Sequence, residues 1–286
     1  ANLAEDLVKI RRTSLKKELQ REESFSPQRP IFNRLLALSF SAFDQFSRPE
    51  SEHVSYIYCG IRNKKGALSR RNLDQRYSEN LNRIKEADRE NVWLSFIHKT
   101  LGEASDDVEQ DILDRDDSDA RTLTKLSSGQ AILAHTITAL IAWIEHDSIV
   151  LFDEPETHLH PNAVASLFNA FNGILGKFKS YAIIATHSPL VIQEIPGKRV
   201  VLFDRADNMT VAKSIGIETF GENISELTRH VFDTVEIPSY YKKILQELSE
   251  FRTFDEVMNM FNNDLSMSAQ SYLLSLHMEN DNETIE

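Results

Sequence analysis

Two adjacent carboxylates, Asp153 and Glu154, directly follow the apolar run "SIVLF" (148–152). Such a run is typical of a strand buried on both faces, and ligands of open α/β sheets collect at the carboxyl ends of strands. Two carboxylates this close repel each other unless a cation or a donor relieves them. A magnesium–phosphate complex would do so, with Asp153 holding the metal and Glu154 orienting and deprotonating an attacking water. The alternative is a surface turn without chemistry.

A histidine follows the next apolar run. "YAIIAT" (181–186) is typical of a second buried strand, and His187 comes directly after it. Because sequential parallel strands usually pair, we expect His187 to lie beside Glu154. Its imidazole could donate to a phosphate oxygen. A lone histidine is also often only structural.

The segment "LSSGQ" (126–130) precedes a helix that we expect over 131–144. A helix N-terminus offers free N–H groups and a partial positive charge, so it attracts phosphate. Ser128 and Gly129 let the backbone come close, and a serine hydroxyl can add a donor. Taken alone, the segment could be an ordinary helix cap.

These residues need an α/β framework to position them. Strand 148–153, a helix beginning at Pro161 and strand 181–186 form a parallel crossover unit. The helix carries an apolar stripe at three-and-four spacing, made of Val164, Leu167, Phe168, Phe171, Ile174, Leu175 and Phe178. A further strand with its exit loop is predicted within 31–43, and a hairpin over 199–214 that turns at 207–208.

The flanking segments are predicted to be mainly helical. We expect a charged helix over 1–23, helical spacing from 77 to 101 and a mobile acidic segment over 103–120. From residue 237 onward a tail is expected, with further helix over 254–278. Its first helix has an apolar stripe of Tyr241, Ile244, Leu245, Leu248 and Phe251. The predicted organisation is therefore 1–236 with an insert at about 47–122, followed by the tail 237–286.

Composition excludes several classes of protein. The net charge of −12 argues against a general nucleic-acid coat, although 9–17 and 62–71 are basic. These two stretches are read mainly as solvated faces. Cys59 is the only cysteine, so an internal disulfide is impossible and a cytoplasmic location is expected. No apolar run is long enough for a membrane span.

Taken in this order and spacing, three motifs carry a family resemblance. "LSSGQ", "SIVLFDEPETHLHP" and "IIATHSP" resemble the signature loop, the Walker B strand with its D-loop, and the switch-histidine loop of ABC-type ATPases. "DEPETHLHP" is similar to the form found in the soluble branch with SMC-, RecF- and OLD-like heads. Weaker matches at 35–46, 57–69 and 218–232 resemble PtuA-like ATPases of Septu and retron anti-phage defence systems. The resemblance implies a mostly parallel sheet flanked by helices.

The resemblance also implies roles for individual residues. Asp153 would hold Mg²⁺, Glu154 would activate water and His187 would contact the γ-phosphate of ATP. The signature-loop residues, which would contact the ATP of the opposite subunit, are Ser127, Ser128, Gly129 and Gln130. His158 and His160 would lie in the D-loop at the dimer seam, or could instead form a metal site. Gln45 is a weak candidate for the Q-loop, because its offset from the strand is unusual.

The phosphate-cradling pattern Gly-x4-Gly-Lys-Ser/Thr does not occur in this sequence. "GILGKFKS" (173–180) lacks the earlier glycine and follows the Walker B motif. The resemblance places the P-loop before the first strand, so we expect it N-terminal to residue 1. A degenerate head is the other reading.

The resemblance implies an ATPase that dimerises around ATP as a homodimer or higher even oligomer. It would act as a sensor in defence and control an associated HNH-type nuclease, with DNA or retron DNA or RNA as a further partner. The alternative is a nucleotide-gated scaffold, or a DNA-repair-type ATPase with little turnover. A transporter subunit is disfavoured by the D-loop and by the insert. A long coiled coil is excluded because the insert lacks sustained heptads.

Overall fold

The computed structural model describes residues 31–39, 56–60, 70–106, 108–109, 123, 125–206, 209–231 and 240–283. The chain divides into two compact units, residues 1–227 and residues 228–286. The predicted helix over 1–23, Gln45, the hairpin turn at 207–208 and most of the acidic segment lie outside the described residues.

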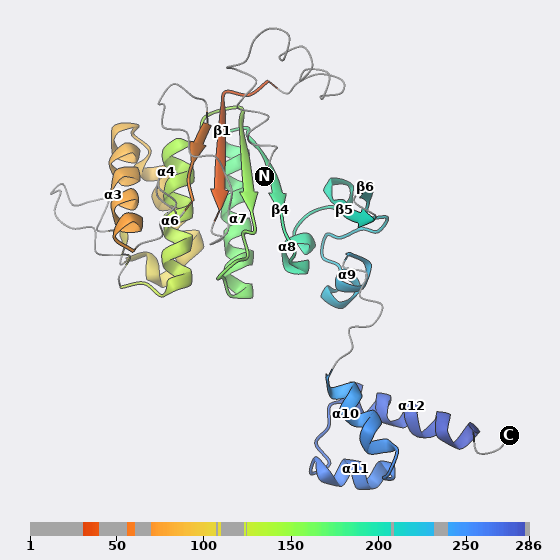
Figure 1. The fold of residues 1–286 in the computed structure, drawn as a ribbon. Helices are drawn as coiled ribbons and strands as arrows, with labels where there is room; N and C mark the ends of the chain where they lie inside the picture. Colours follow the sequence, from red (N-terminus) through yellow and green to blue (C-terminus); the bar gives the residue numbers. More distant parts are fainter. Residues whose placement is uncertain are drawn as a thin grey trace. The chain divides into compact units, whose positions relative to one another are not determined.

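The first unit is built on a parallel sheet. Its strands are β1 (Arg34–Ser39), β2 (Tyr56–Tyr58), β3 (Ser148–Asp153) and β4 (Tyr181–Ala185). They lie side by side in the order β2-β1-β3-β4, and every pairing is parallel (Figure 1). β2 and β3 therefore lie on opposite sides of β1, which makes the β1/β3 boundary a switch point in strand order. The predicted α/β fold is confirmed.

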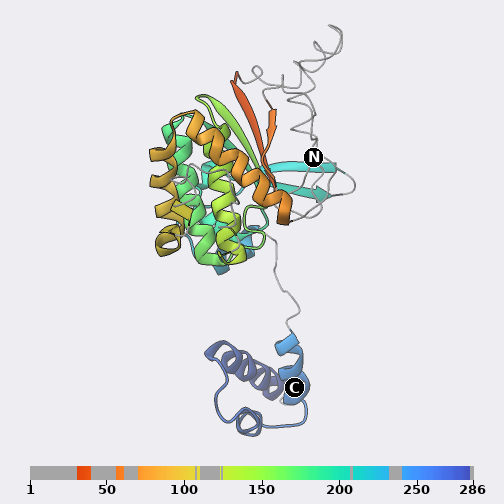
Figure 2. The ribbon, with the colours of Figure 1, turned by 90° about the vertical axis from the view of Figure 1, so that its left-hand side faces the viewer.

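Helices cover one face of this sheet (Figure 2). They are α3 (Arg70–Glu86), α4 (Glu90–Leu101), α6 (Ser128–Trp143) and α7 (Pro161–Lys177). Every second strand residue, including Leu36, Val150 and Phe152, belongs to the large core shared with these helices. The predicted apolar stripe of α7 is buried as expected, apart from the half-buried Leu175.

The intervening strand residues face the other way. Leu35, Ala37, Ile149 and Leu151 are buried in a second cluster with Tyr56 and Tyr58. In β4, however, Tyr181 is 72% and Ile183 50% exposed. The prediction that 181–186 is a buried strand was therefore wrong, since even Ala182 and Ile184 on the other face are only half-buried. Within the described residues β4 is the last strand of the sheet, and the helices pack only on its Ala182 and Ile184 side.

Arginines hold the C-terminal end of α6 in place. Arg89 Nη1 donates to the carbonyl oxygens of Ile141 and Ile144, both at 2.8 Å. Arg83 Nε donates to Ala142 O, and Arg34 Nη1 to Trp143 O. The last carbonyls of a helix have no partner within the helix and carry partial negative charge. Three guanidinium groups from β1, α3 and the α3–α4 turn satisfy them here. The end of α6 is therefore bonded both to the sheet and to the α3–α4 segment.

Two predicted helices end or begin elsewhere. The helical spacing over 77–101 belongs to two helices, α3 and α4, separated where Asp88 adopts a left-handed φ of 53°. The helix expected over 131–144 begins earlier, at Ser128, because Ser127 and Gln130 form a reciprocal capping box.

Shorter elements complete the first unit. They are η1 (Gly102–Ser105), α8 (Pro189–Gln193), η3 (Gly197–Arg199), β5 (Val201–Ala206) and β6 (Met209–Ser214), while α9 (Ile224–Val231) spans the boundary between the two units at residues 227 and 228. β5 and β6 pair antiparallel with Ala206 opposite Met209, so the predicted hairpin forms. Within the described residues, no helix has the length and hydropathy needed to cross a membrane.

The second unit contains α10 (Tyr240–Ser249), α11 (Phe254–Met260) and α12 (Met267–Glu283). Leu245, Val257, Ala269 and Leu273 form its core. The predicted stripe is only partly buried, since Tyr241 is 46% and Phe251 81% exposed. The helix expected over 254–278 is two helices, because Asn262 and Asn263 turn the chain with positive φ.

Candidate functional site

The predicted carboxylates lie at the switch point of the sheet. Ser39, Asp153 and Ala185 are in register at the carboxyl ends of β1, β3 and β4. The Glu154 N–H donates to Ala185 O at 2.9 Å, so the two strand ends remain joined one residue further on. Switch points at the carboxyl ends of parallel strands are where such sheets bind ligands. His187 comes two residues beyond Ala185 and therefore follows the strand that pairs with β3.

Glu154 has a strained backbone. Its φ is +48°, a left-handed conformation that costs a residue with a Cβ of the order of 1 kcal/mol. Its carboxylate is half-buried, and Oε2 accepts from Thr157 Oγ1 at 3.3 Å. Such strain at a non-glycine residue is concentrated at sites where a side chain must be aimed in one direction. Here it turns the chain sharply at the end of β3.

Sequence reasoning missed Glu156. Its Oε1 accepts from Thr186 Oγ1 at 2.8 Å and from the His187 N–H at 3.0 Å. The Thr186 hydroxyl in turn accepts from the Ser188 N–H at 3.0 Å. The loop after β3 is thus tied to the loop that carries His187. The only sequence signal was a further carboxylate in "DEPE", and no residue spacing revealed its partners.

The signature-loop residues form the beginning of α6. Ser127 Oγ accepts from the Gln130 N–H, and the Gln130 side-chain oxygen accepts from the Ser127 N–H at 3.0 Å. The Gln130 amide oxygen is therefore engaged in the cap, while Ser127 and Ser128 are exposed. A Cβ on Gly129 would lie 3.9 Å from Leu159 Cδ2. The start of α6 thus lies next to the D-loop of the same chain.

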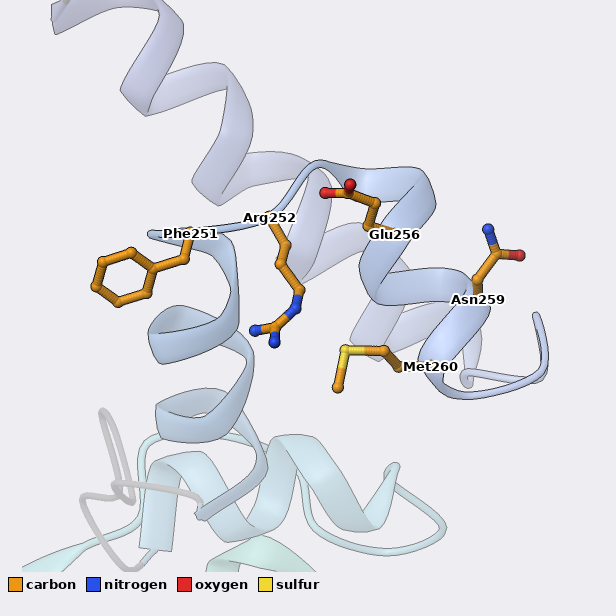
Figure 3. Close-up of a pocket in the computed structure, with 5 residues that line it drawn as sticks. All are labelled: Phe251, Arg252, Glu256, Asn259 and Met260. Carbon is orange, nitrogen blue, oxygen red and sulfur yellow. The ribbon is translucent and has the colours of Figure 1, made fainter.

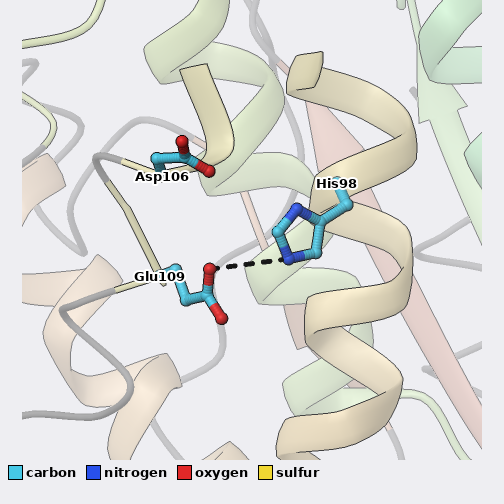
Figure 4. A group of neighbouring side chains, drawn as sticks. All are labelled: His98, Asp106 and Glu109. Carbon is cyan, nitrogen blue, oxygen red and sulfur yellow. Dashed lines mark ion pairs between the residues drawn. The ribbon is translucent and has the colours of Figure 1, made fainter. Parts of the chain in front are cut away.

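The two D-loop histidines do different things. His158 is exposed with a φ of +69°, and His160 caps α7 by accepting from the Asn162 N–H at 3.4 Å. They are not part of a metal-type cluster within the described residues. The one group there that combines three such side chains is His98, Asp106 and Glu109 (Figure 4).

That group is explained by pairing between neighbours. His98 Nδ1 lies 2.8 Å from Ser105 Oγ, which also bonds Gly102 O. The other ring nitrogen, Nε2, lies 3.7 Å from Glu109 Oε2. These contacts fasten α4 to the turn that follows it.

The hollow shown in Figure 3 belongs to the second unit and contains none of the predicted catalytic, nucleotide-binding or metal-binding residues. Phe251, Arg252, Glu256, Asn259 and Met260 line a space of about 650 Å³ between α10 and α11. Glu256 is occupied as a helix cap, because its carboxylate accepts from the Thr253 N–H at 2.9 Å. This bonding lowers the pKa of Glu256. The hollow holds no pair of groups suited to hydrolysis.

Comparison with known proteins identifies the family. A model described as "AAA domain, putative AbiEii toxin, Type IV TA system" matches residues 9–193. The chain belongs to this AAA domain family. It is also 28% identical over 284 aligned residues to protein ea59 of Escherichia phage lambda, which covers 87% of the chain. The chain spans 54% of that relative's length.

The AAA family membership supports the coarse prediction of a nucleotide-binding, ATPase-type domain. The matched range contains the signature segment, the β3 carboxylates and His187. The site also suits a nucleotide-bound Mg²⁺ chemically, because a carboxylate at a strand end offers the oxygen ligand that this ion prefers.

Proposed function

We propose that this chain is the later part of an ABC-type ATPase head that hydrolyses ATP at the carboxyl edge of its sheet. The observation that carries the proposal is the placement of Asp153 and Glu154 at the β1/β3 switch point, with the Glu154 amide bonded to the end of β4, the strand that the His187 loop follows. The proposal requires a P-loop, and the pattern Gly-x4-Gly-Lys-Ser/Thr does not occur within residues 1–286.

Each residue has a distinct task in this proposal. Asp153 would hold Mg²⁺, which when bound neutralises charge on the phosphates. Glu154 accepts a proton from the attacking water. His187 donates to the oxygen on which charge develops. The exposed Ser128 and the N–H groups at the start of α6 would contact the nucleotide of a second subunit.

We further propose that ATP closes a homodimer, or a higher even oligomer, and that hydrolysis reopens it. In this reading the protein is a sensor in anti-phage defence that controls an associated nuclease. Two facts support this role. The weaker sequence matches at 35–46, 57–69 and 218–232 resemble PtuA-like ATPases, and the family description names a toxin of a toxin–antitoxin system.

Replacing Glu154 by glutamine tests the proposal. In the natural full-length protein, Glu154→Gln should lower ATP turnover by about 10²-fold or more, because general-base catalysis is lost. ATP binding should persist, and the ATP-bound dimer should accumulate in size-exclusion chromatography with light scattering. Glu86→Gln, at an exposed glutamate of α3, is the matched control. Unchanged turnover in the Glu154 variant would overturn the assignment.

A nucleotide-gated scaffold is the alternative function. The exposed apolar residues of the second unit, with Phe251 81% and Met267 81% exposed, favour docking of a partner there. Tight ATP binding with turnover below about one per minute in the parent protein, far under the usual enzyme range, would select this alternative. Loss of phage protection in Glu154→Gln cells would instead tie hydrolysis to defence.

A further inference from the structure

Glu156 connects the two loops that carry the proposed chemical groups. Its Oε1 receives two hydrogen bonds, from the Thr186 hydroxyl and the His187 amide. Thr186 extends the connection by accepting from the Ser188 N–H, just before α8 begins at Pro189. One carboxylate oxygen therefore sets the path of the chain between the end of β4 and α8.

One oxygen of the Glu156 carboxylate has two hydrogen-bond donors, and the other has none among the described residues. Glu156 Oε2 is buried and has no hydrogen-bond partner among the described residues. An unpartnered buried oxygen disfavours folding unless other contacts compensate. Both hydrogen bonds to the His187 loop reach Glu156 through Oε1, so this one oxygen joins the two loops.

We infer that Glu156 is a positioning residue that holds His187 at its place relative to Glu154. The inference rests on the proposed function, because positioning has meaning only if His187 and Glu154 act on one nucleotide. Glu156 is two residues beyond Glu154 and bonds the amide of His187. Any shift of one loop is therefore passed directly to the other.

Removing the carboxylate should affect turnover more than binding. In the natural full-length protein, Glu156→Ala should lower kcat roughly 10- to 100-fold, because small misplacements of a reacting group have effects of this size. The Kd for ATP should change less than about threefold, since it does not require this alignment. Glu156→Gln should restore most of kcat, because an amide oxygen can accept the same two bonds.

A double-mutant cycle separates positioning from general stability. If Glu156 acts through His187, then Glu156→Ala combined with His187→Ala should be no slower than His187→Ala alone. Losses that multiply would contradict the inference, as would a Glu156→Gln variant as slow as Glu156→Ala. Glu86→Ala is the control. If Glu156→Ala does not fold, Thr186→Val removes one of the two donors and should lower kcat in the same direction.

A readout independent of hydrolysis makes the test decisive. Hydrogen exchange of a peptide spanning 186–193 should speed up in Glu156→Ala and remain at the parent rate in Glu156→Gln, because the His187 amide loses its acceptor only in the first. Unchanged exchange in Glu156→Ala would overturn the inference. Full turnover in both Glu154→Gln and His187→Ala would instead overturn the proposed function. The exchange rates would still show whether Glu156 holds the His187 amide.

Discussion

His135 is a histidine in an apolar interior. It is 1% exposed on α6, and neither ring nitrogen has a hydrogen-bond partner among the described residues. Burial, with a smaller contribution from the positive charge of Arg76, lowers the pKa of His135 to about 3. The folded protein therefore keeps His135 neutral where the unfolded chain, with a pKa near 6.5, binds a proton.

This difference predicts loss of stability in acid. The free energy of unfolding that depends on a neutral His135 is fully present above pH 6.5. Below this pH it falls by about 1.4 kcal/mol per pH unit, down to the pKa of His135 in the folded protein. His135→Leu should remove the slope, so that its stability relative to the parent improves by about 2 kcal/mol between pH 7.5 and pH 5. Urea unfolding at both pH values measures this. The exposed His146→Gln is the control, and parallel pH profiles of His135→Leu and the parent would contradict the prediction.

At the carboxyl edge of the sheet, sequence patterns predicted which strand ends adjoin but not the hydrogen bonds between the loops that follow them. Asp153, Glu154 and His187 could be placed because parallel strand ends share one edge. Glu156 could not, because its partners are a hydroxyl and a backbone N–H in another loop. The left-handed φ of Glu154 was equally hidden, since such strain is not encoded in residue type.

At the scale of elements, the hydrogen bonds from arginines to the last carbonyls of α6 predict an effect on stability. Burial lowers the pKa of Arg89, and the nearby Glu145 acts in the opposite direction. Arg89→Ala leaves two helix carbonyls without its donors and should lower the free energy of unfolding by about 2 kcal/mol. Arg89→Lys should recover only part, since an ammonium lacks the fork geometry. Denaturant unfolding tests this, and a loss no larger than that of the exposed Arg199→Ala would refute it.

Element types were predicted better than element limits. Buried β3 and the apolar stripe of α7 follow from residue pattern alone. The break at Asp88 and the turn at Asn262 depend on positive φ values, which apolar periodicity does not reveal. The exposed face of β4, formed by Tyr181, Ile183 and Ala185, also escaped prediction, because burial of a strand face depends on what packs against it and not on its own sequence.

At the scale of the whole molecule, the proposed dimer shares each site between two chains. Ser128 and Gly129 begin α6 next to the chain's own D-loop, with Ser128 exposed. A second subunit related by twofold symmetry would present the same residues to the first. Two variants then fail for different reasons. Gly129→Glu should spoil the site of its partner, and Glu154→Gln should spoil its own.

Mixing the two variants should therefore restore turnover. In a mixed dimer one site combines the intact Glu154 of one subunit with the intact Gly129 of the other, while the second site carries both defects. With random pairing at equal amounts, half of the dimers are mixed and half of their sites work, which gives about a quarter of the parent turnover. ATPase assays after co-refolding or subunit exchange measure this, with each variant alone as control. A mixture no more active than the mean of the two variants would mean that the sites are not shared, because each chain would then have to complete its own.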